Sequence, residues 1–418
     1  MKSARESALL ILYRVENDGA YPNILLKDML PNEMSKLDRA LATSLVYGVI
    51  NKQITLDYII SQKSNIKLKK LSKYILLILR MGIYQLLYMN KIPQNAAVNE
   101  SVKLAKRYGH SASAGYVNGI LRNISKNGFE YPKDKMQCLS VKYSFPLWMC
   151  KKWTDEFGYN FTKELMMAFD EEPMLTIRPN TLKTDINSLA NKLKSDGVEI
   201  RIQDDAIMCK GLDVVNDRLY KEGFYTVQDI AAMQASKQLN PQSNETVIDM
   251  CAAPGGKTTH IAELMQNKGK IYAFDVYDHK IDLIKNSAKR LGIDIIEAKI
   301  GDALKYDDAL KEIADRVLCD VPCSGTGIIR RKPDIKLNRK ETDSFYEIQS
   351  TILNNASKYV KHGGVLVYST CSIEKEENEA VTGEFLNNNN EFERLYEKTY
   401  YPNTDGTDGF YICKMKRN

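Results

Sequence analysis

The chain has 418 residues, of which 44% are hydrophobic and 27% are charged, as in ordinary folded domains. This length predicts two or three domains and excludes a miniprotein held together by disulfides. The most apolar stretch, Tyr74 to Met89, contains Arg80 and Gln85 and falls short of the roughly 20 residues that span a bilayer. We find no signal peptide, and the eight cysteines lack framework spacing, so we expect a cytoplasmic protein.

The net charge of +6 is distributed unevenly along the chain. Residues 1–130 carry 19 Lys and Arg against 9 Asp and Glu, whereas the remaining residues carry 40 against 44. The excess includes Lys67, Lys69, Lys70 and Lys73. Such asymmetry is typical of a module that docks on a polyanion, although a solvated basic helix face gives the same composition.

Residues 1–128 predict an all-α domain. Apolar residues recur at helical spacing, for example at Leu41, Leu45 and Val49, and residues 74–89 are apolar on nearly all sides, as in a central helix. Further helices are expected over residues 97–107 and 114–124, with Gly, Pro and Asn at the boundaries.

Residues 129–230 predict a small α+β linking module. Residues 175–178 and 198–202 alternate between apolar and polar at the strand period. Residues 186–194 between them have helical spacing and end before Gly197.

Residues 231–418 predict a doubly wound, Rossmann-like α/β domain. Strands are expected over 246–250, 270–275, 295–300, 316–320 and 365–370, with helices over 257–265 and 279–291. Residues 392–396 and 410–415 would add antiparallel strands at an edge. In such a sheet, ligands bind at the carboxyl ends of the parallel strands.

A small-residue loop directly follows the first of these strands and opens a helix. Its glycines let a ligand approach the backbone, and the helix N-terminus favours negative charge. The loop departs from the phosphate-binding GxxxxGK[ST] pattern, which makes nucleotide hydrolysis a minority interpretation. We predict that it binds a cofactor through Cys251, Ala252, Ala253, Pro254, Gly255, Gly256 and Lys257.

Two acidic residues follow the next two strands. Asp275 is placed to accept the two hydroxyls of a ribose, and Asp302 to meet a base edge. Each acid alone could equally cap a helix or face solvent. Together with the loop they predict an adenosyl pocket, and the absence of GxGxxG spacing makes a dinucleotide site less favoured.

Two cysteines stand beyond later strand ends, Cys323 after the fourth strand and Cys371 after the fifth. Cysteine is usually a small buried hydrophobe, and we interpret the cysteines at 138, 150, 209, 319 and 413 in that way. Two thiols at the ligand-binding edge of one sheet instead indicate a catalytic role. No second CxxC or nearby histidine completes a zinc site, so we expect no metal.

Taken together, these motifs resemble a known family. Cys-Ala-Ala-Pro-Gly-Gly-Lys at 251–257, Asp-Val-Pro-Cys-Ser-Gly-Thr-Gly at 320–327 and Tyr-Ser-Thr-Cys-Ser at 368–372 are similar to those of S-adenosylmethionine-dependent RNA cytosine-5 methyltransferases of the Sun family. Residues 99–105 and 116–122 resemble a NusB-like RNA-binding domain. Within the family, this combination implies methylation of cytosine 967 in 16S rRNA.

The resemblance implies roles for individual residues. Cys371 would attack carbon 6 of cytosine to form a covalent adduct, and Cys323 would release the methylated product. Asp320 would contact nitrogen 3 of the base as a hydrogen-bonding partner or acid, and would also belong to the cofactor site. A helix beginning near Ile373 would favour the Cys371 thiolate through its dipole, opposed by the glutamates that follow.

The implied substrate is an unstacked cytosine in single-stranded or loop regions of 16S rRNA. Basic residues of the first domain and Arg330, Arg331 and Lys332 would hold its phosphates. Two alternatives stay open: a tRNA cytosine-5 methyltransferase, and an RNA-binding assembly factor without catalysis. No coiled-coil heptad indicates an oligomer, so a monomer is favoured.

Overall fold

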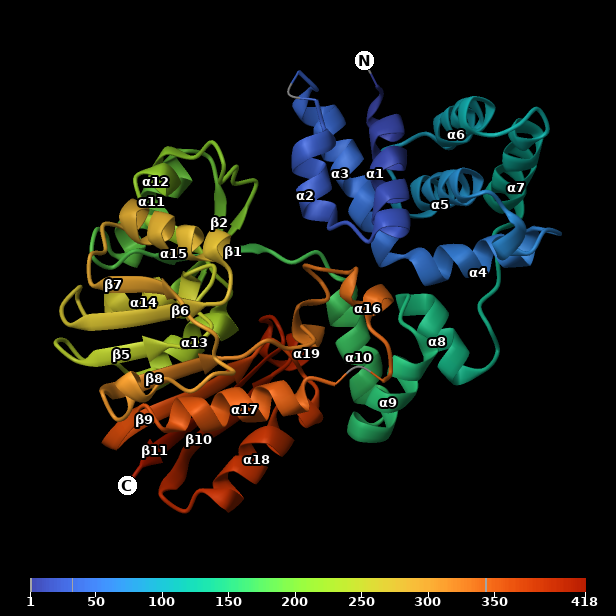
Figure 1. Cartoon of the computed structure of the whole chain (residues 1–418). Helices are drawn as coiled ribbons and strands as arrows, with labels where there is room; N and C mark the ends of the chain where they lie inside the picture. The colour runs from blue at the N-terminus through green and yellow to red at the C-terminus, as the bar shows by residue number, and fades with distance from the viewer. Residues whose placement is uncertain (1, 32, 343) are drawn as a thin grey trace. The chain divides into compact units, whose positions relative to one another are not determined.

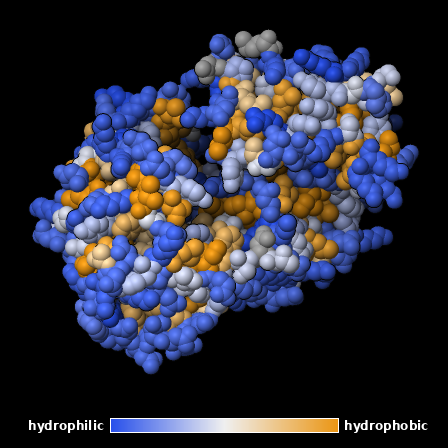
Figure 2. Space-filling model, in the orientation of Figure 1, coloured by the Kyte–Doolittle hydropathy of each residue, from blue (hydrophilic) through white to orange (hydrophobic). Residues whose placement is uncertain are grey.

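The structure is a computed structural model that describes residues 2–31, 33–342 and 344–418 (Figure 1). It divides into two compact units: residues 1–170 with 336–341, and residues 171–335 with 342–418. Hydrophilic residues cover most of the face seen in Figure 2, with smaller hydrophobic patches between them. Among the described residues, no helix is long and apolar enough to cross a membrane.

The first unit is helical, as the sequence predicts. Several of its helices begin at a side-chain cap, for example at Ser3, Ser35 and Ser72, whose hydroxyls accept a hydrogen bond from the first turn. Its helices are α1 (Ala4–Asp18), α2 (Pro22–Met29), α3 (Lys36–Asn51), α4 (Gln53–Lys63), the 3₁₀ turn η1 (Leu68–Lys70), α5 (Lys73–Tyr88), α6 (Gln94–Tyr108), α7 (Ser113–Asn127), α8 (Lys135–Tyr143), α9 (Leu147–Phe157) and α10 (Tyr159–Asp170).

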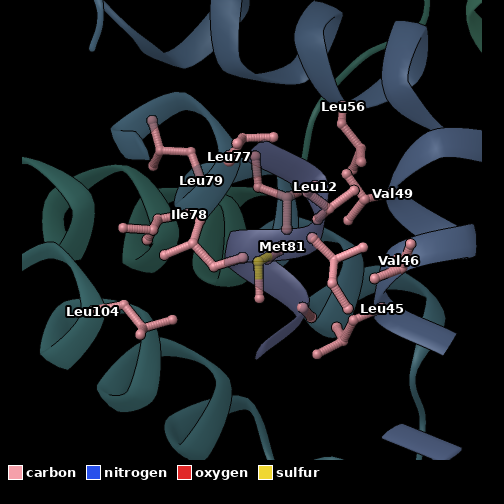
Figure 3. Close-up of a cluster of buried hydrophobic side chains, with 14 of the residues drawn as sticks. Leu12, Leu45, Val46, Val49, Leu56, Leu77, Ile78, Leu79, Met81 and Leu104 are labelled. Atoms are coloured by element: carbon pink, nitrogen blue, oxygen red, sulfur yellow. The ribbon is translucent and has the colours of Figure 1, made fainter. Parts of the chain in front are cut away.

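Helix α5 is the central helix of this unit, as its apolar sequence predicts. It packs against α1, α3, α4, α6 and α7, and its Leu77, Ile78 and Met81 lie in the core shown in Figure 3. Arg80 in the same helix is buried, and its guanidinium pairs with Asp57 and Glu16. A buried charge of this kind requires such partners.

Helices α8 to α10 are a feature that the sequence patterns did not reveal. Phe145, Trp153 and Phe169 form their aromatic core, with ring centroids 5.6–6.1 Å apart. Lys336, in the short helix α16 (Ile335–Asn338), donates to Asn51 Oδ1 at 2.7 Å and lies 4.5 Å from the Phe145 ring centroid. Its burial lowers the pKa of the Lys336 ammonium to about 7.

The second unit contains a small antiparallel sheet in the order β2-β3-β1-β4, with α11 packed on it. The predicted strands at 175–178 and 198–202 and the helix between them are confirmed. β3 and β4 were not predicted: β3 forms a hairpin with β2, with Gln203 paired to Ala206, and β4 has three residues and pairs with the distant β1. The elements are β1 (Leu175–Pro179), α11 (Ile186–Ser195), β2 (Glu199–Gln203), β3 (Ala206–Lys210), α12 (Arg218–Lys221) and β4 (Tyr225–Val227).

The larger sheet of this unit has seven strands in the order β10-β11-β9-β8-β5-β6-β7. Strands β9, β8, β5, β6 and β7 are parallel, whereas β11 and β10 form the predicted antiparallel hairpin at one edge. The strands are β5 (Thr246–Asp249), β6 (Lys270–Asp275), β7 (Ile296–Ile300), β8 (Ala314–Asp320), β9 (Val360–Thr370), β10 (Phe392–Tyr400) and β11 (Phe410–Arg417).

Helices cover both faces of this sheet, which confirms the predicted Rossmann-like architecture (Figure 1). One face packs on α13, α14 and α15, and the other on α17 and α18. The remaining elements are α13 (Ile230–Leu239), α14 (Gly256–Leu264), α15 (Asp278–Leu291), α17 (Tyr346–Ser357), α18 (Glu379–Asn388), α19 (Pro402–Asp405), η2 (Asp308–Leu310), η3 (Thr326–Ile328) and η4 (Lys375–Glu377).

Candidate active site

The predicted cofactor loop joins β5 to α14. At its start, Asp249 is fully buried and accepts a hydrogen bond from the Thr258 hydroxyl at 2.7 Å, which ties the strand end to the helix. Burial raises the pKa of Asp249 to about 7. Gly255 has φ +100°, and a Cβ there would lie 3.2 Å from the Ile284 backbone, so the tight turn favours glycine.

A cavity of about 410 Å³ opens beside this loop, within the second unit. It brings together predicted residues from five consecutive strand ends of the sheet: Cys251 and Ala253, Asp275, Asp302, Asp320 and Cys323, and Cys371. The other predicted loop residues, Ala252, Pro254, Gly255, Gly256 and Lys257, form the turn or the start of α14.

The two strand-end acids differ in their surroundings. Asp275 is 7% exposed, and its Oδ1 accepts no hydrogen bond among the described residues, although Lys280 Nζ lies 3.3 Å away. Asp302 is more exposed and accepts from the Leu304 amide at 3.1 Å. Other residues that line the cavity were not predicted from the sequence, among them Lys280, Ile348 and Ile352. The i, i+4 spacing of the two isoleucines on α17 was the sequence signal that could have identified them.

The two predicted thiols meet at the other end of the cavity. β8 and β9 are parallel neighbours, with Asp320 paired to Ser369, so the residues that follow each strand emerge at the same edge. The Sγ atoms of Cys323 and Cys371 lie 3.2 Å apart. All eight cysteines are free thiols; those at 150, 209, 319 and 413 are buried, as predicted, whereas Cys138 is half-buried.

Asp320 is held in a fixed orientation beside the thiols. Its Oδ2 accepts from Lys257 Nζ at 2.7 Å, and its Oδ1 accepts from the Ser369 hydroxyl at 2.8 Å. The Lys257 ammonium also lies 5.0 Å from the Phe410 ring centroid. Burial disfavours the charged ammonium, but the adjacent Asp320 raises the pKa of Lys257 above its ordinary value.

The surroundings distinguish the two thiols electrostatically. The hydrogen bond from Cys323 lowers the pKa of Cys371, against the effects of burial and of the Asp320 carboxylate, and the charges of Lys257 and Lys332 lower it further. The same hydrogen bond, together with burial and the carboxylate of Glu377, raises the pKa of Cys323. Cys371 is therefore the thiol that ionises first.

The predicted helix next to Cys371 is wrong. No helix begins near Ile373; the 3₁₀ turn η4 begins at Lys375, and α18 begins at Glu379. Buried hydrogen bonds hold the intervening residues instead, including that from the Ile373 amide to the Thr326 hydroxyl at 3.2 Å. The thiolate of Cys371 thus depends on neighbouring side chains rather than on a helix dipole.

Arg330 and Arg331, predicted to bind phosphates, are engaged in ion pairs within the second unit, and their phosphate-binding role stays a prediction. Arg330 pairs with Asp408 at 2.6 Å and Arg331 pairs with Asp229 at 3.1 Å, and Arg331 also pairs with Asp408. The aspartates are 11% and 4% exposed in their side chains, so these ion pairs are structural. They fix the segment after Cys323 against the start of α13.

Fold and cavity together define a Rossmann-like methyltransferase domain with two thiols at its ligand edge. Three family models match the chain: NusB family at residues 2–126, a ferredoxin-like domain of RsmF/B-like methyltransferases at 145–213, and 16S rRNA methyltransferase RsmB/F at 236–416.

Relatives cover the whole chain. A probable ribosomal RNA small subunit methyltransferase B of Bacillus subtilis is 39% identical over 99% of both chains, and a ribosomal RNA small subunit methyltransferase B of Proteus mirabilis is 31% identical over 99% of this chain and 98% of its own. The crystal structure of PH0851 covers 100% of this chain and 99% of its own, with a TM-score of 0.84 and 28% identity. The chain therefore belongs to the RsmB/F family of 16S rRNA methyltransferases.

Proposed function

We propose that this protein transfers a methyl group from S-adenosyl-L-methionine to carbon 5 of a cytosine in 16S rRNA, at the position corresponding to cytosine 967. The observation that carries the proposal is the pair of thiols, 3.2 Å apart, lining the same cavity as the strand-end acids. The printed names of the relatives from Bacillus subtilis and Proteus mirabilis support a small-subunit ribosomal RNA as substrate.

The cavity fits the proposed cofactor. Asp275 offers a buried carboxylate oxygen without a hydrogen bond among the described residues, as a ribose hydroxyl requires. Asp302 lines the cavity on the neighbouring strand, and the backbone at Cys251 and Ala253 closes it from the loop side. When bound, S-adenosylmethionine supplies an electrophilic methyl group on a sulfonium centre.

Cys371 activates carbon 5 of the cytosine, which is a poor nucleophile in the intact ring. Its thiolate adds to carbon 6 of the cytosine, which breaks the aromatic system and makes carbon 5 nucleophilic. Carbon 5 then bonds to the methyl group as the bond from methyl to sulfonium breaks. The lowered pKa of Cys371 supports its assignment as the nucleophile, because a thiolate is required for the first step.

Asp320 and Cys323 complete the proposed cycle. Asp320, held by Lys257 and Ser369, is assigned the contact with nitrogen 3, to which its acid form donates a hydrogen bond as negative charge develops on the ring. After methyl transfer, the carbon 5 proton passes to water, its bonding electrons restore the ring double bond, and the bond between carbon 6 and sulfur breaks, returning its electron pair to Cys371. We assign this release to Cys323, whose sulfur adjoins that of Cys371.

The target base has to leave its stack to reach both a thiol and the cofactor. We therefore propose a cytosine in a single-stranded or loop region, flipped into the cavity. The basic excess of residues 1–130 supports electrostatic docking of the surrounding RNA by the NusB-like domain.

The test is a denaturing gel of Cys323→Ala mixed with S-adenosylmethionine and an unmodified 16S rRNA transcript. Cys371→Ala and a tRNA transcript serve as controls. We expect a protein–RNA adduct with Cys323→Ala that Cys371→Ala does not form, because the adduct accumulates when release is blocked.

Other outcomes contradict particular parts of the proposal. An adduct with Cys371→Ala alone would reverse the roles of the thiols. An adduct with tRNA alone would replace the ribosomal substrate. With no adduct on either the transcript or the small ribosomal particle, the covalent mechanism would be rejected.

A further inference from the structure

A buried hydrogen-bonded group outside the cavity holds the turn that carries Cys323. The Glu377 carboxylate accepts from the Ser324 amide at 2.8 Å through its Oε2. The Gln349 side-chain amide donates to the same oxygen at 3.2 Å and to the Pro322 carbonyl at 2.9 Å. We call Glu377 and Gln349 the turn clamp, because together they bind the residues on both sides of Cys323.

The turn clamp is itself fixed by the fold. Glu377 and Gln349 are 2% and 0% exposed, on η4 and α17 respectively. The Tyr368 hydroxyl, from β9, donates to the Glu377 carbonyl at 2.6 Å. Hydrogen bonds from amides to a buried carboxylate are stronger than those between neutral groups, so this arrangement can set the position of a neighbouring thiol.

We propose that Glu377 is the positioning residue of Cys323: it holds the Pro322–Ser324 turn and places a negative charge that confines the thiolate to Cys371. A clamp built only to shape the turn could use a neutral acceptor. The Glu377 carboxylate is bonded to the amide of the residue that follows Cys323, and its charge opposes ionisation of Cys323. The main influences on Cys371 are instead the adjoining Cys323, Asp320, Lys257 and Lys332.

The consequence for the reaction is that one thiol is ionised while the other stays protonated. Two thiols 3.2 Å apart cannot both ionise easily, because like charges in a buried site repel. The titratable groups around the two thiols decide which sulfur carries the negative charge. The role assigned to Glu377 rests on the proposed function and extends it. These groups are Asp320, Tyr368, Glu377, Lys257 and Lys332.

The test measures each thiol alone, without RNA or cofactor, so its outcome is independent of methyl transfer. Cys371→Ala leaves Cys323 as the thiol of the pair, and Cys323→Ala leaves Cys371. In each background, alkylation by iodoacetamide is followed against pH by peptide mass spectrometry, with and without Glu377→Gln. The matched control is Glu379→Gln, which removes an acid two residues away whose carboxylate accepts from Thr399.

With Glu377→Gln, we expect the midpoint for Cys323 to fall by about half a pH unit or more, a threefold gain in its ratio of thiolate to thiol. The midpoint for Cys371 should stay in place, and Glu379→Gln should move neither. A purely structural role would move both midpoints together or neither, and either result would overturn the proposal.

A thermal melt shows whether Glu377→Gln is folded. A second variant serves for the test if it is not. Glu377→Asp keeps the charge but draws it back by one methylene from the Ser324 amide. We then expect a smaller fall of the Cys323 midpoint, with Cys371 unmoved. An unmoved Cys323 midpoint in a folded Glu377→Asp protein would equally overturn the proposal.

Discussion

Lys257 shows how a residue chosen for one reason in the sequence acquires another role in the structure. The motif suggested a cofactor contact, but the ammonium pairs with Asp320 and helps to lower the pKa of Cys371. The lysine thus links the cofactor loop to the two proposed catalytic groups through charge.

This arrangement predicts the effect of Lys257→Met. Removing the ammonium raises the pKa of Cys371, so at neutral pH the thiolate becomes scarcer and methyl transfer slows by about tenfold for each pKa unit. Because the thiolate returns as pH rises, the acid limb of the rate profile should move to higher pH. The profile of initial rate against pH checks this, with Lys270→Met as control, because the Lys270 side chain at the start of β6 is 49% exposed. A loss that is equal at every pH would contradict the electrostatic role.

The buried ion pair of Arg178 and Glu263 predicts a large stability effect. Their side chains are 3% and 1% exposed, the shortest contact is 2.8 Å, and Arg178 also donates to the Gly256 carbonyl at the start of α14. Arg178→Met leaves a buried carboxylate unpaired, so we expect a loss of about 3–5 kcal/mol in the free energy of unfolding. Urea denaturation measures it. The double variant with Glu263→Met should recover most of that loss; no recovery would show that the other hydrogen bonds of Arg178 dominate.

At the scale of elements, the close approach of η3 to the segment before β11 is a strict packing requirement. A Cβ on Gly327 would lie 2.0 Å from the Gly409 carbonyl oxygen, and the Gly327 amide donates to the Cys371 carbonyl at 3.0 Å. The turns that carry both thiols therefore depend on this contact.

We expect Gly327→Ala to cost about 1–3 kcal/mol of stability, because two backbone segments have to separate. Methyl transfer should fall more than stability explains, since the Cys371 backbone shifts. Chemical denaturation and initial rates measure the two effects. Gly383→Ala, on α18 with open space around its Cα, is the control and should stabilise by up to about 1 kcal/mol. A folded Gly327→Ala protein of normal activity would refute the packing argument.

Elements with a complete local pattern were predictable, and elements made by distant pairing were not. Buried parallel strands such as β5 and β9 contain short apolar runs, and β11 of the antiparallel tail begins with the apolar run Phe410 to Cys413. β4 has three residues and exists because it pairs with β1. The helix expected at Ile373 fails because buried side-chain hydrogen bonds satisfy the backbone there in place of a helical turn.

At the scale of the whole molecule, charge predicts how RNA binds. Lys67, Lys69 and Lys70 are exposed around η1, whereas Arg330 and Arg331 are committed to ion pairs. Replacing the three lysines by alanine should reduce the slope of log affinity against log salt by about 2, at about 0.7 per lost phosphate contact. Binding to the 16S transcript at several salt concentrations measures the slope. The control replaces the exposed Lys194, Lys210 and Lys221; an equal change in both variants would exclude a specific basic surface.

The division into 1–128, 129–230 and 231–418 stays a prediction. Limited proteolysis with mass spectrometry tests the first boundary: cleavage is expected near residue 128, which we placed between domains, and not inside α5 or β8. Resistance near residue 128 would reject that boundary.

By itself, the sequence determined the fold class and placed the small-residue loop, the strand-end acids and both thiols at one edge of the sheet, because each depends on residue types at local spacing. Only the tertiary structure decided which charges surround those thiols. Lys257, Glu377 and Gln349 reach the site from three elements far apart in the chain. Since electrostatic effects depend on distance and burial, the difference between Cys323 and Cys371 arises only when the sheet brings these elements together.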